Sequence, residues 1–274
     1  MKTTPLINKY SESNTKSTLN KRQKDIVNLA RKDGFVTVEV LADSFKVTQQ
    51  TIRRDLSFLS DNLYIERTHG GAFFQSGVTN VRHDSRQAIA QKEKMAIAIK
   101  VSSIIPDNAS VVLNIGTTTE QVAKNLVNTH KGLKIITNNI NIVNIAANNE
   151  NCEVWVAGGK VRMGDNAVLG STAANFIKNF KIDYAIVGIS AIDENGTLLD
   201  FDHDELIVTQ EIYKQSRKII LIADSNKFYR KAPYVTGNLI DVDIFVTDIT
   251  PSKKIIKICK NNNVDLIITP SSDK

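Results

Sequence analysis

The sequence contains little cysteine and no long apolar run, and both absences narrow what the protein can be. Cys152 and Cys259 are the only cysteines, and neither has a second cysteine or a histidine at the spacing of metal ligands. We interpret both as structural thiols and expect no metal site. No apolar stretch approaches the roughly 20 residues that cross a bilayer. Residues 1–19 mix Lys, Ser, Thr and Asn and lack the apolar core of a secretory signal, so we expect a cytoplasmic protein that contacts no membrane.

The motifs of common cofactor sites are also missing. The sequence has no Walker loop, no Gly-x-Gly-x-x-Gly and no zinc cluster, so we expect no cofactor. Its composition, with 42% apolar and 23% charged residues, is that of a globular protein. A length of 274 residues exceeds what one hydrophobic core comfortably fills, which predicts a small domain joined to a larger one.

Positive charge is concentrated in the first quarter of the chain. Residues 1–74 contain twelve Lys or Arg against eight Asp or Glu, whereas the other 200 residues are close to neutral. A basic small domain suits a polyanion such as DNA, because each neutralised phosphate releases condensed counterions.

The residues after position 20 have the pattern of a helix-turn-helix. Apolar spacing predicts a first helix between Lys21 and Asp33, and Thr37 is a good N-cap for a short second helix. Thr48 is a second N-cap, opening a helix whose buried stripe is Ile52, Leu56 and Leu59. The opposite face of that helix would then face the major groove, where Gln can pair with adenine and Arg with guanine. The expected DNA-binding residues of this helix are Thr48, Gln49, Gln50, Thr51, Arg53 and Arg54.

Two β-prone segments follow around a Gly-Gly turn, which predicts the hairpin wing of a winged helix. Arg67 and His69 lie where they could reach backbone phosphate or the minor groove. For His69, a plain surface turn histidine is an equal alternative. We expect a disordered tail over residues 1–19, a winged helix-turn-helix domain over 20–76, a linker over 77–91 and an effector-binding domain over 92–274.

The larger domain has the pattern of an α/β fold. Seven short apolar runs alternate with helical stretches, which indicates a mainly parallel sheet covered on both faces. Ligands bind outside the carboxyl ends of such strands, and small, polar or basic residues follow five consecutive runs. A helix start with glycine and hydroxyls favours a phosphate. The candidate ligand-binding residues at these ends are Gly116, Thr117, Thr118, Thr119, Asn138, Asn139, Gly158, Gly159, Gly188, Ser190 and Lys227.

The segments Thr51–Leu56 and Arg67–Ala72 resemble the N-terminal motif of the DeoR family of bacterial sugar-metabolism repressors, and the likeness continues through nearly the whole chain after residue 20. The resemblance implies a sensing domain with the fold of ribose-5-phosphate isomerase. In those isomerases the loop matching Gly188–Ala191 carries acidic catalytic residues. Here that loop has no carboxylate, so we expect binding without turnover and no catalytic residue.

Residues 137–141, 188–193 and 199–205 are similar to a member of that family that responds to glycerol 3-phosphate, which implies this inducer, with Asp202 and Glu205 among its contacts. Asn114 and Thr119 depart from that member, where Asp and Pro stand, and this leaves a different sugar phosphate open. His203 is either a ligand contact or a surface histidine.

The resulting prediction is a transcriptional repressor of carbohydrate or glycerol metabolism genes. It would bind double-stranded operator DNA as a homo-oligomer, a dimer or tetramer, because one small helix-turn-helix buries too little surface for specific affinity. A phosphorylated ligand would release it. Two alternatives remain at this point: a sugar-phosphate isomerase-like enzyme with a DNA-binding appendage, and a weakly specific architectural DNA binder.

Overall fold

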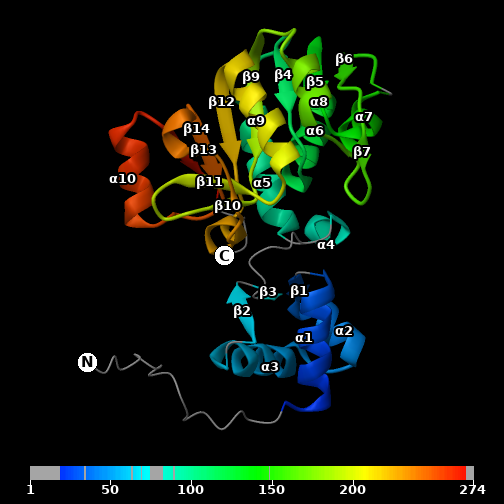
Figure 1. The fold of residues 1–274 in the computed structure, drawn as a ribbon, viewed down its shortest axis with the longest axis vertical. Coiled ribbons are helices and arrows are strands. Elements are labelled where there is room, and N and C mark those ends of the chain that lie inside the picture. The colour runs from blue at the N-terminus through cyan, green and yellow to red at the C-terminus, as the bar shows by residue number, and fades with distance from the viewer. Residues whose placement is uncertain are drawn as a thin grey trace, which may run out of the picture.

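The computed structural model describes residues 19–33, 35–62, 64–68, 70–74, 83–88, 90–147 and 149–269. A winged helix and a larger α/β body follow one another along the chain (Figure 1). Residues 1–18 of the expected tail, and residues 77–82 and 89 of the expected linker, lie outside the described residues.

The winged helix follows the predicted helix pattern. Helices α1 (Lys21–Asp33), α2 (Val38–Phe45) and α3 (Gln49–Asp61) precede the wing strands β2 (Ile65–Thr68) and β3 (Gly71–Phe74). The backbone N–H of Val40 donates to Thr37 Oγ1 at 3.1 Å and that of Thr51 to Thr48 Oγ1 at 3.3 Å, so both expected N-caps form. The sequence pattern missed the short strand β1 (Phe35–Thr37), which pairs with β3 and completes an antiparallel sheet of order β1-β3-β2.

The core of this domain lies under α3. The expected stripe of Ile52, Leu56 and Leu59 is fully buried. Asp55 is buried on the same side, where Arg22 Nε donates to Asp55 Oδ2 at 2.6 Å and Gln23 Nε2 donates to Oδ1 at 3.1 Å. This polar contact fixes α1 against α3, and the apolar stripe alone gave no sign of it.

The larger body is built on a seven-stranded sheet in which every neighbouring pair is parallel. All seven apolar runs expected from the sequence are its strands. The strand order is β15-β14-β12-β9-β4-β5-β6. In chain order the strands are β4 (Ser110–Leu113), β5 (Leu133–Thr137), β6 (Cys152–Val156), β9 (Ile182–Gly188), β12 (Ser216–Ile222), β14 (Ile244–Thr247) and β15 (Asp265–Ile268).

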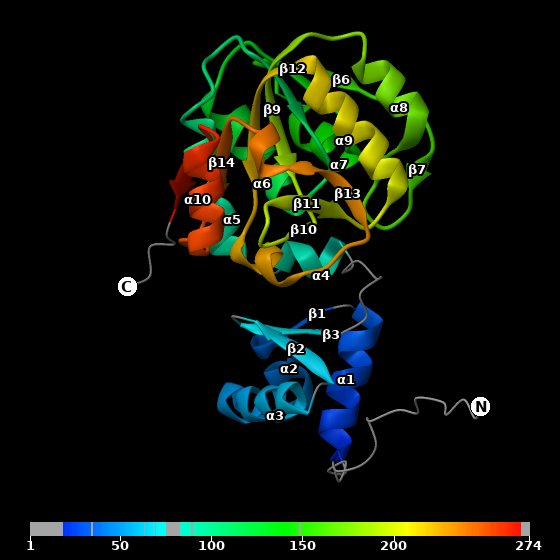
Figure 2. The same cartoon turned by 60° about the vertical axis from the view of Figure 1, so that its left-hand side comes forward.

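Helices cover both faces of this sheet. One apolar core joins it to α5 (Gln91–Ser102), α6 (Thr117–Thr129) and α7 (Ile140–Ala146). The other core joins it to α8 (Gly170–Ile177), α9 (His203–Gln215) and α10 (Lys253–Asn261). Side chains alternate between the cores along the inner strands, as in β12, where Ile220 and Ile222 enter one core and Leu221 the other. Figure 2 shows α8 and α9 side by side over the sheet.

Short elements extend one end of the sheet. Strands β7 (Val161–Arg162) and β8 (Ala167–Val168) form an antiparallel pair. Strands β10 (Ala191–Ile192), β11 (Thr197–Asp200) and β13 (Tyr234–Asn238) form a small antiparallel sheet. The 3-10 helix η1 (Ser225–Tyr229) follows β12, and η2 (Leu239–Asp241) follows β13. Residues His83–Ala88, within the expected linker, form the helix α4.

The connection order reverses between β4 and β9. From β4 the chain moves to β5 and β6 on one side, and then returns to β9, β12, β14 and β15 on the other. Such a reversal opens a crevice at the carboxyl ends of the two central strands, which is where open α/β sheets bind ligands. The strand order therefore places a site beyond Leu113 and Gly188.

Candidate functional site: an exposed helix face and a charged pocket

The outward face of α3 carries polar and basic side chains. Thr48, Gln49, Gln50, Arg53 and Arg54 are exposed, and Thr51 is half-buried. Arg53 Nη2 donates to Gln49 Oε1 at 3.0 Å, so this arginine is held along the helix surface near its N-terminal end. Because the apolar stripe faces inward, these side chains are free to contact a partner.

The wing adds a further cation to this surface. Arg67 on β2 is exposed, and its Nη1 donates to Ser57 Oγ of α3 at 2.6 Å. This contact draws the wing arginine toward the same helix. His69 lies outside the described residues.

A pocket lies at the carboxyl ends of β4, β9 and β12, at the reversal of strand order. Of the expected ligand residues, the pocket wall contains Gly116, Thr117, Thr118, Gly188, Ser190, Glu205 and Lys227. Asn114 forms the floor between the two central strands. Its Oδ1 accepts from Gly188 N at 2.8 Å and its Nδ2 donates to Gly188 O at 3.0 Å.

Helix α6 begins in this pocket without a side-chain cap. Gly116 is its N-cap, with φ +153°, and no side chain accepts a hydrogen bond from the first turn. The first four N–H groups of a helix have no partner within the helix, and its dipole favours an anion there. Thr117 and Thr118 are buried beside these groups. The pocket thus offers backbone and hydroxyl donors to an anionic ligand.

Charged side chains of both signs face the pocket. Burial, together with the positive charge of the neighbouring Arg230, lowers the pKa of Lys227 to about 7. Burial together with the Asp200 carboxylate raises the pKa of Glu205 to about 8, and burial also raises the pKa of Asp200. A hydrogen bond with Ser190 opposes the shift at Asp200. The carboxyl pair can therefore hold a proton near neutral pH.

Several expected ligand residues lie outside the pocket wall. Thr119 is fully buried, and its Oγ1 donates to Gly116 O at 2.7 Å, which stabilises the helix start. Asn138 Nδ2 donates to Val168 O at 2.9 Å, and Asn139 caps α7. Asp202 caps α9 and pairs with Arg162 at 2.7 Å. Gly158 and Gly159, also absent from the wall, follow the edge strand β6.

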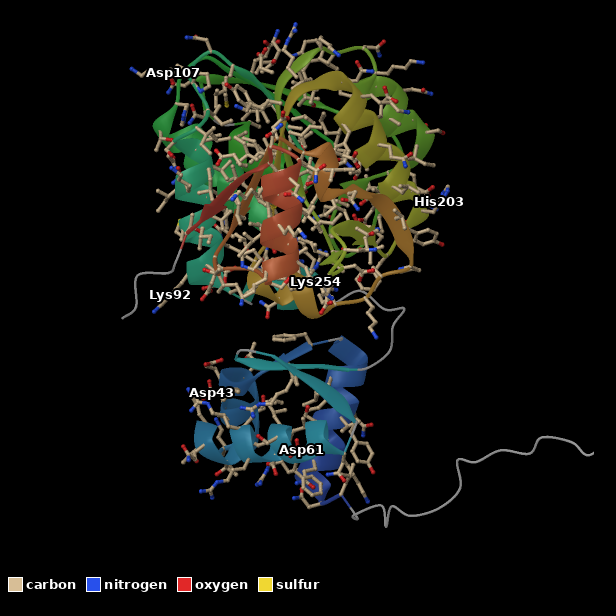
Figure 3. All side chains as sticks on the ribbon, turned by 90° about the vertical axis from the view of Figure 1, so that its left-hand side faces the viewer. Asp43, Asp61, Lys92, Asp107, His203 and Lys254 are labelled. Carbon is tan, nitrogen blue, oxygen red and sulfur yellow. The ribbon has the colours of Figure 1, made fainter. Side chains whose placement is uncertain are left out.

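Sequence reasoning missed four polar or charged residues near or in the pocket. Its wall includes Asp200, at the end of β11, Arg86, on α4, and Asn114. Arg230 lies close enough to shift the pKa of Lys227. Glu205 was expected from the family resemblance, but nothing in the sequence indicated that Asp200 lies beside it. His203 is exposed in Figure 3 and packs edge-on against Tyr234, with ring centroids 5.8 Å apart, and it is absent from the wall.

A buried polar network beside the pocket joins α4 to α6 and α7. His83 Nε2 lies 2.9 Å from Glu120 Oε1, and the same carboxylate accepts from Asn141 Nδ2 at 2.9 Å and from Asn139 Nδ2 at 3.2 Å. These hydrogen bonds lower the pKa of Glu120 against the opposing effect of its burial. The network holds α4 against the α/β body.

Two family comparisons account for most of the chain. The DeoR-like helix-turn-helix domain matches residues 22–77, and the DeoR C-terminal sensor domain matches residues 89–249. The chain belongs to the DeoR family. This confirms the predicted fold class, a winged helix-turn-helix followed by an α/β sensor domain.

Curated relatives agree with the family assignment. The glycerol-3-phosphate regulon repressor of Escherichia coli (strain K12) is 37% identical over 245 residues, covering 89% of this chain and 97% of that protein. Its namesake from Haemophilus influenzae is 38% identical, covering 90% and 96%. The transcriptional repressor CsqR of E. coli is 34% identical, covering 94% and 98%. These names are those of DNA-binding regulators, which confirms the prediction that this DeoR-family chain is not an enzyme.

Solved structures show more distant likenesses. Ribose 5-phosphate isomerase from Plasmodium falciparum aligns with a TM-score of 0.37 and 19% identity, covering 50% of this chain and 52% of that one. The translation initiation factor eIF-2B of Pyrococcus horikoshii OT3 aligns with a TM-score of 0.41 and 13% identity, covering 78% and 74%. Likenesses at this level indicate nothing about ligand or reaction.

Two further observations concern the described residues alone. None of their helices combines the length and apolar character that a membrane crossing needs. Within the same residues, no group of three or more His, Cys, Asp or Glu is arranged to hold a metal ion. Cys152 and Cys259 are both free thiols.

Proposed function

We propose that this DeoR-family protein is a cytoplasmic transcriptional repressor that binds double-stranded operator DNA and is released by a phosphorylated ligand, glycerol 3-phosphate or a related sugar phosphate. The observation that carries the ligand assignment is the uncapped start of α6 in a pocket with Lys227. The relatives named for the glycerol-3-phosphate regulon support glycerol 3-phosphate as the first ligand to test.

The face of α3 supports the DNA-binding half of the proposal. Gln50, Arg53 and Arg54 are exposed near the N-terminal end of a helix whose other face is buried. Winged helix-turn-helix proteins insert this end into the major groove, where Arg and Gln read guanine and adenine. Arg67 on the wing, and His69 beyond it, would contact the phosphate backbone or the minor groove.

The pocket supports a ligand with an anionic end and a hydroxyl end. The phosphoryl group would cap α6 at Gly116–Thr118 and pair with Lys227. Across the pocket, Asp200, Glu205 and Ser190 provide acceptors for ligand hydroxyls. A carboxyl pair that shares a proton can both accept from and donate to hydroxyls, which suits a polyol phosphate better than inorganic phosphate.

Binding at the two sites would be coupled. We expect a homo-oligomer, a dimer or tetramer, because one winged helix buries too little surface for specific affinity. Its recognition helices would lie on two half-sites of the operator. The ligand-bound arrangement would no longer match the half-site spacing. By thermodynamic linkage, operator DNA must weaken ligand binding by the factor with which ligand weakens DNA binding.

The proposal is tested with the full-length chain and DNA selected from a random library. Operator affinity is measured by fluorescence anisotropy with and without glycerol 3-phosphate, with glycerol as the matched neutral control. We expect glycerol 3-phosphate, and not glycerol, to weaken operator binding. Equal operator affinity at saturating concentrations of every phosphorylated probe would refute ligand-controlled release.

A further inference from the structure

Helix α4 contributes a residue to the pocket from outside both matched domains, and the charge of that residue, Arg86, acts on the pKa values of Glu205 and Lys227. The helix-turn-helix match ends at residue 77 and the sensor match begins at residue 89, whereas α4 spans His83–Ala88. Arg86 of this helix nevertheless lines the pocket together with Thr117 and Lys227. The connection between the two domains is therefore part of the pocket wall.

Hydrogen bonds position the backbone of α4 at the pocket. Thr117 Oγ1 donates to the carbonyl oxygen of Arg86 at 3.5 Å, and Lys94 Nζ donates to the same oxygen. Gln87 Nε2 donates to Glu120 Oε2 at 3.3 Å, next to the contact between His83 and Glu120. Both α5 and α6 therefore hold α4 beside the start of α6.

The guanidinium of Arg86 has an unused donor. Its side chain is 15% exposed, and Nη2 lies 3.6 Å from Asp165 Oδ2, a distance at the long end of an ion pair. Its Nε is buried and has no hydrogen-bond partner among the described residues. A buried donor without a partner is unfavourable, and a guanidinium presents its N–H groups in a fork that matches the oxygens of a phosphate.

We propose that Arg86 is a ligand-binding residue that donates from its guanidinium to the phosphoryl oxygens, and that the ligand thereby ties α4 to the start of α6. This inference rests on the proposed function, because it requires an anionic ligand in the pocket. It adds a third partner for the anion, after the start of α6 and Lys227, and this partner lies on the connector between the two domains.

The location of α4 gives this contact a consequence for DNA binding. The wing strand β3 ends at Phe74, nine residues before His83. Figures 1 and 2 both show α4 at the end of the α/β body nearest the winged helix. A ligand that contacts Arg86 therefore acts directly on the segment leading to the wing, and Arg86 couples occupancy of the pocket to operator release.

The first test is calorimetric titration of full-length protein with glycerol 3-phosphate. Arg86→Ala should weaken binding roughly 10- to 100-fold, the effect of removing a charge-assisted hydrogen bond. Arg86→Lys should lose less, because it keeps the charge without the fork. Arg217→Ala is the matched control: its side chain is 63% exposed and lies 3.6 Å from Asp183, and it is absent from the pocket wall. This control should bind as the wild type does.

The second test separates ligand contact from a structural role. Hydrogen exchange is followed at saturating ligand, with the concentration raised for each variant to compensate for lost affinity. In the wild type, ligand should slow exchange both at residues 117–120 and across α4. In Arg86→Ala it should still slow exchange at 117–120 but no longer across α4.

The outcomes distinguish this inference from the proposed function. Unchanged affinity in Arg86→Ala, or ligand protection of α4 that persists in it, overturns the role of Arg86 and leaves the proposed function standing. If the wild type binds neither glycerol 3-phosphate nor any other sugar phosphate tried, both fail. The coupling role would also be overturned if saturating ligand protected residues 117–120 of Arg86→Ala and released this variant from operator DNA as completely as the wild type.

Discussion

The two parts of the protein place their charged side chains in opposite environments. On α3, Arg53 and Arg54 are exposed, and the Arg53 side chain donates to Gln49 of the same helix. In the α/β domain, Lys227, Asp200 and Glu205 face one another in a pocket where burial shifts their pKa values. Exposed cations suit a large polyanion whose binding is dominated by counterion release. Glu205 is already paired with Arg162 at 2.5 Å, and a pocket lined by buried charges of both signs suits a small ligand.

Removing a core side chain of α3 should give the largest change in free energy. It should also show whether the α/β domain folds and binds ligand without an intact winged helix. Ile52→Ala should lower the free energy of unfolding of the winged helix by about 2–5 kcal/mol, because Ile52 is fully buried. Thermal unfolding followed by circular dichroism measures this loss. Val40→Ala is the control, since Val40 is 55% exposed and should change stability by less than about 0.5 kcal/mol. Loss of ligand binding in Ile52→Ala would show that the α/β domain depends on an intact winged helix.

Removing Arg53, which we propose reads a base, should give the next largest effect. Arg53→Ala should cost about 1–3 kcal/mol at the operator and less on unrelated DNA, because a bidentate contact to a base carries sequence information. Anisotropy titrations against selected and scrambled DNA measure the difference. An equal loss on both would favour an architectural DNA binder. The affinity of Arg53→Ala for the ligand, measured without DNA, should equal that of the wild type, because Arg53 lies outside the pocket.

The pocket should respond to pH through its buried charges. As pH rises past 7, Lys227 loses its proton in the unliganded protein, and near pH 8 Glu205 gains a negative charge. Both changes make the pocket less favourable for an anion. Ligand affinity should therefore fall with rising pH, by at most about tenfold per pH unit for each linked proton. Calorimetry between pH 6.5 and 9 measures it. Lys227→Arg should remove the fall near pH 7, and a flat wild-type profile would count against both groups.

The smallest expected effect concerns Arg54, on the exposed face of α3. Arg54→Ala should reduce the slope of log affinity against log salt for operator DNA by about 0.9, the contribution of one phosphate contact. Operator titrations between 50 and 200 mM salt measure the slope. Ligand binding in the pocket should depend less on salt, because buried charges are screened less. A slope unchanged by Arg54→Ala would place this arginine away from the phosphates.

Local patterns were enough to predict the three helices of the winged helix and the strands of the large sheet. The stripe of Ile52, Leu56 and Leu59 located the buried face of α3, and the seven apolar runs located the strands of the parallel sheet. These predictions succeed because helical spacing and short apolar runs depend on neighbours a few residues away. The strand β1 was missed because three residues between two helices carry no such periodicity.

The pocket could be predicted only in part, because strand order is not a local property. Residues after β4, β9 and β12 meet there, and these strands are adjacent in the sheet. Asn138 and Gly158 follow β5 and β6 in the same way, but those strands lie toward the edge, on the far side of β4. Arg86 and Asp200 were missed because their elements, α4 and the small sheet, reach the pocket from outside the parallel sheet.

The paired hydrogen bonds between Asn114 and Gly188 join the two halves of the sheet where their connections diverge. The base of the crevice therefore resists spreading, and an incoming molecule cannot make room by parting the central strands. Any adjustment to its size must come from the parts above, namely α4, the end of β11 and the start of α9. If the ligand acts as proposed, a base held in this way would leave movement to these peripheral segments, and α4 is the one nearest the winged helix.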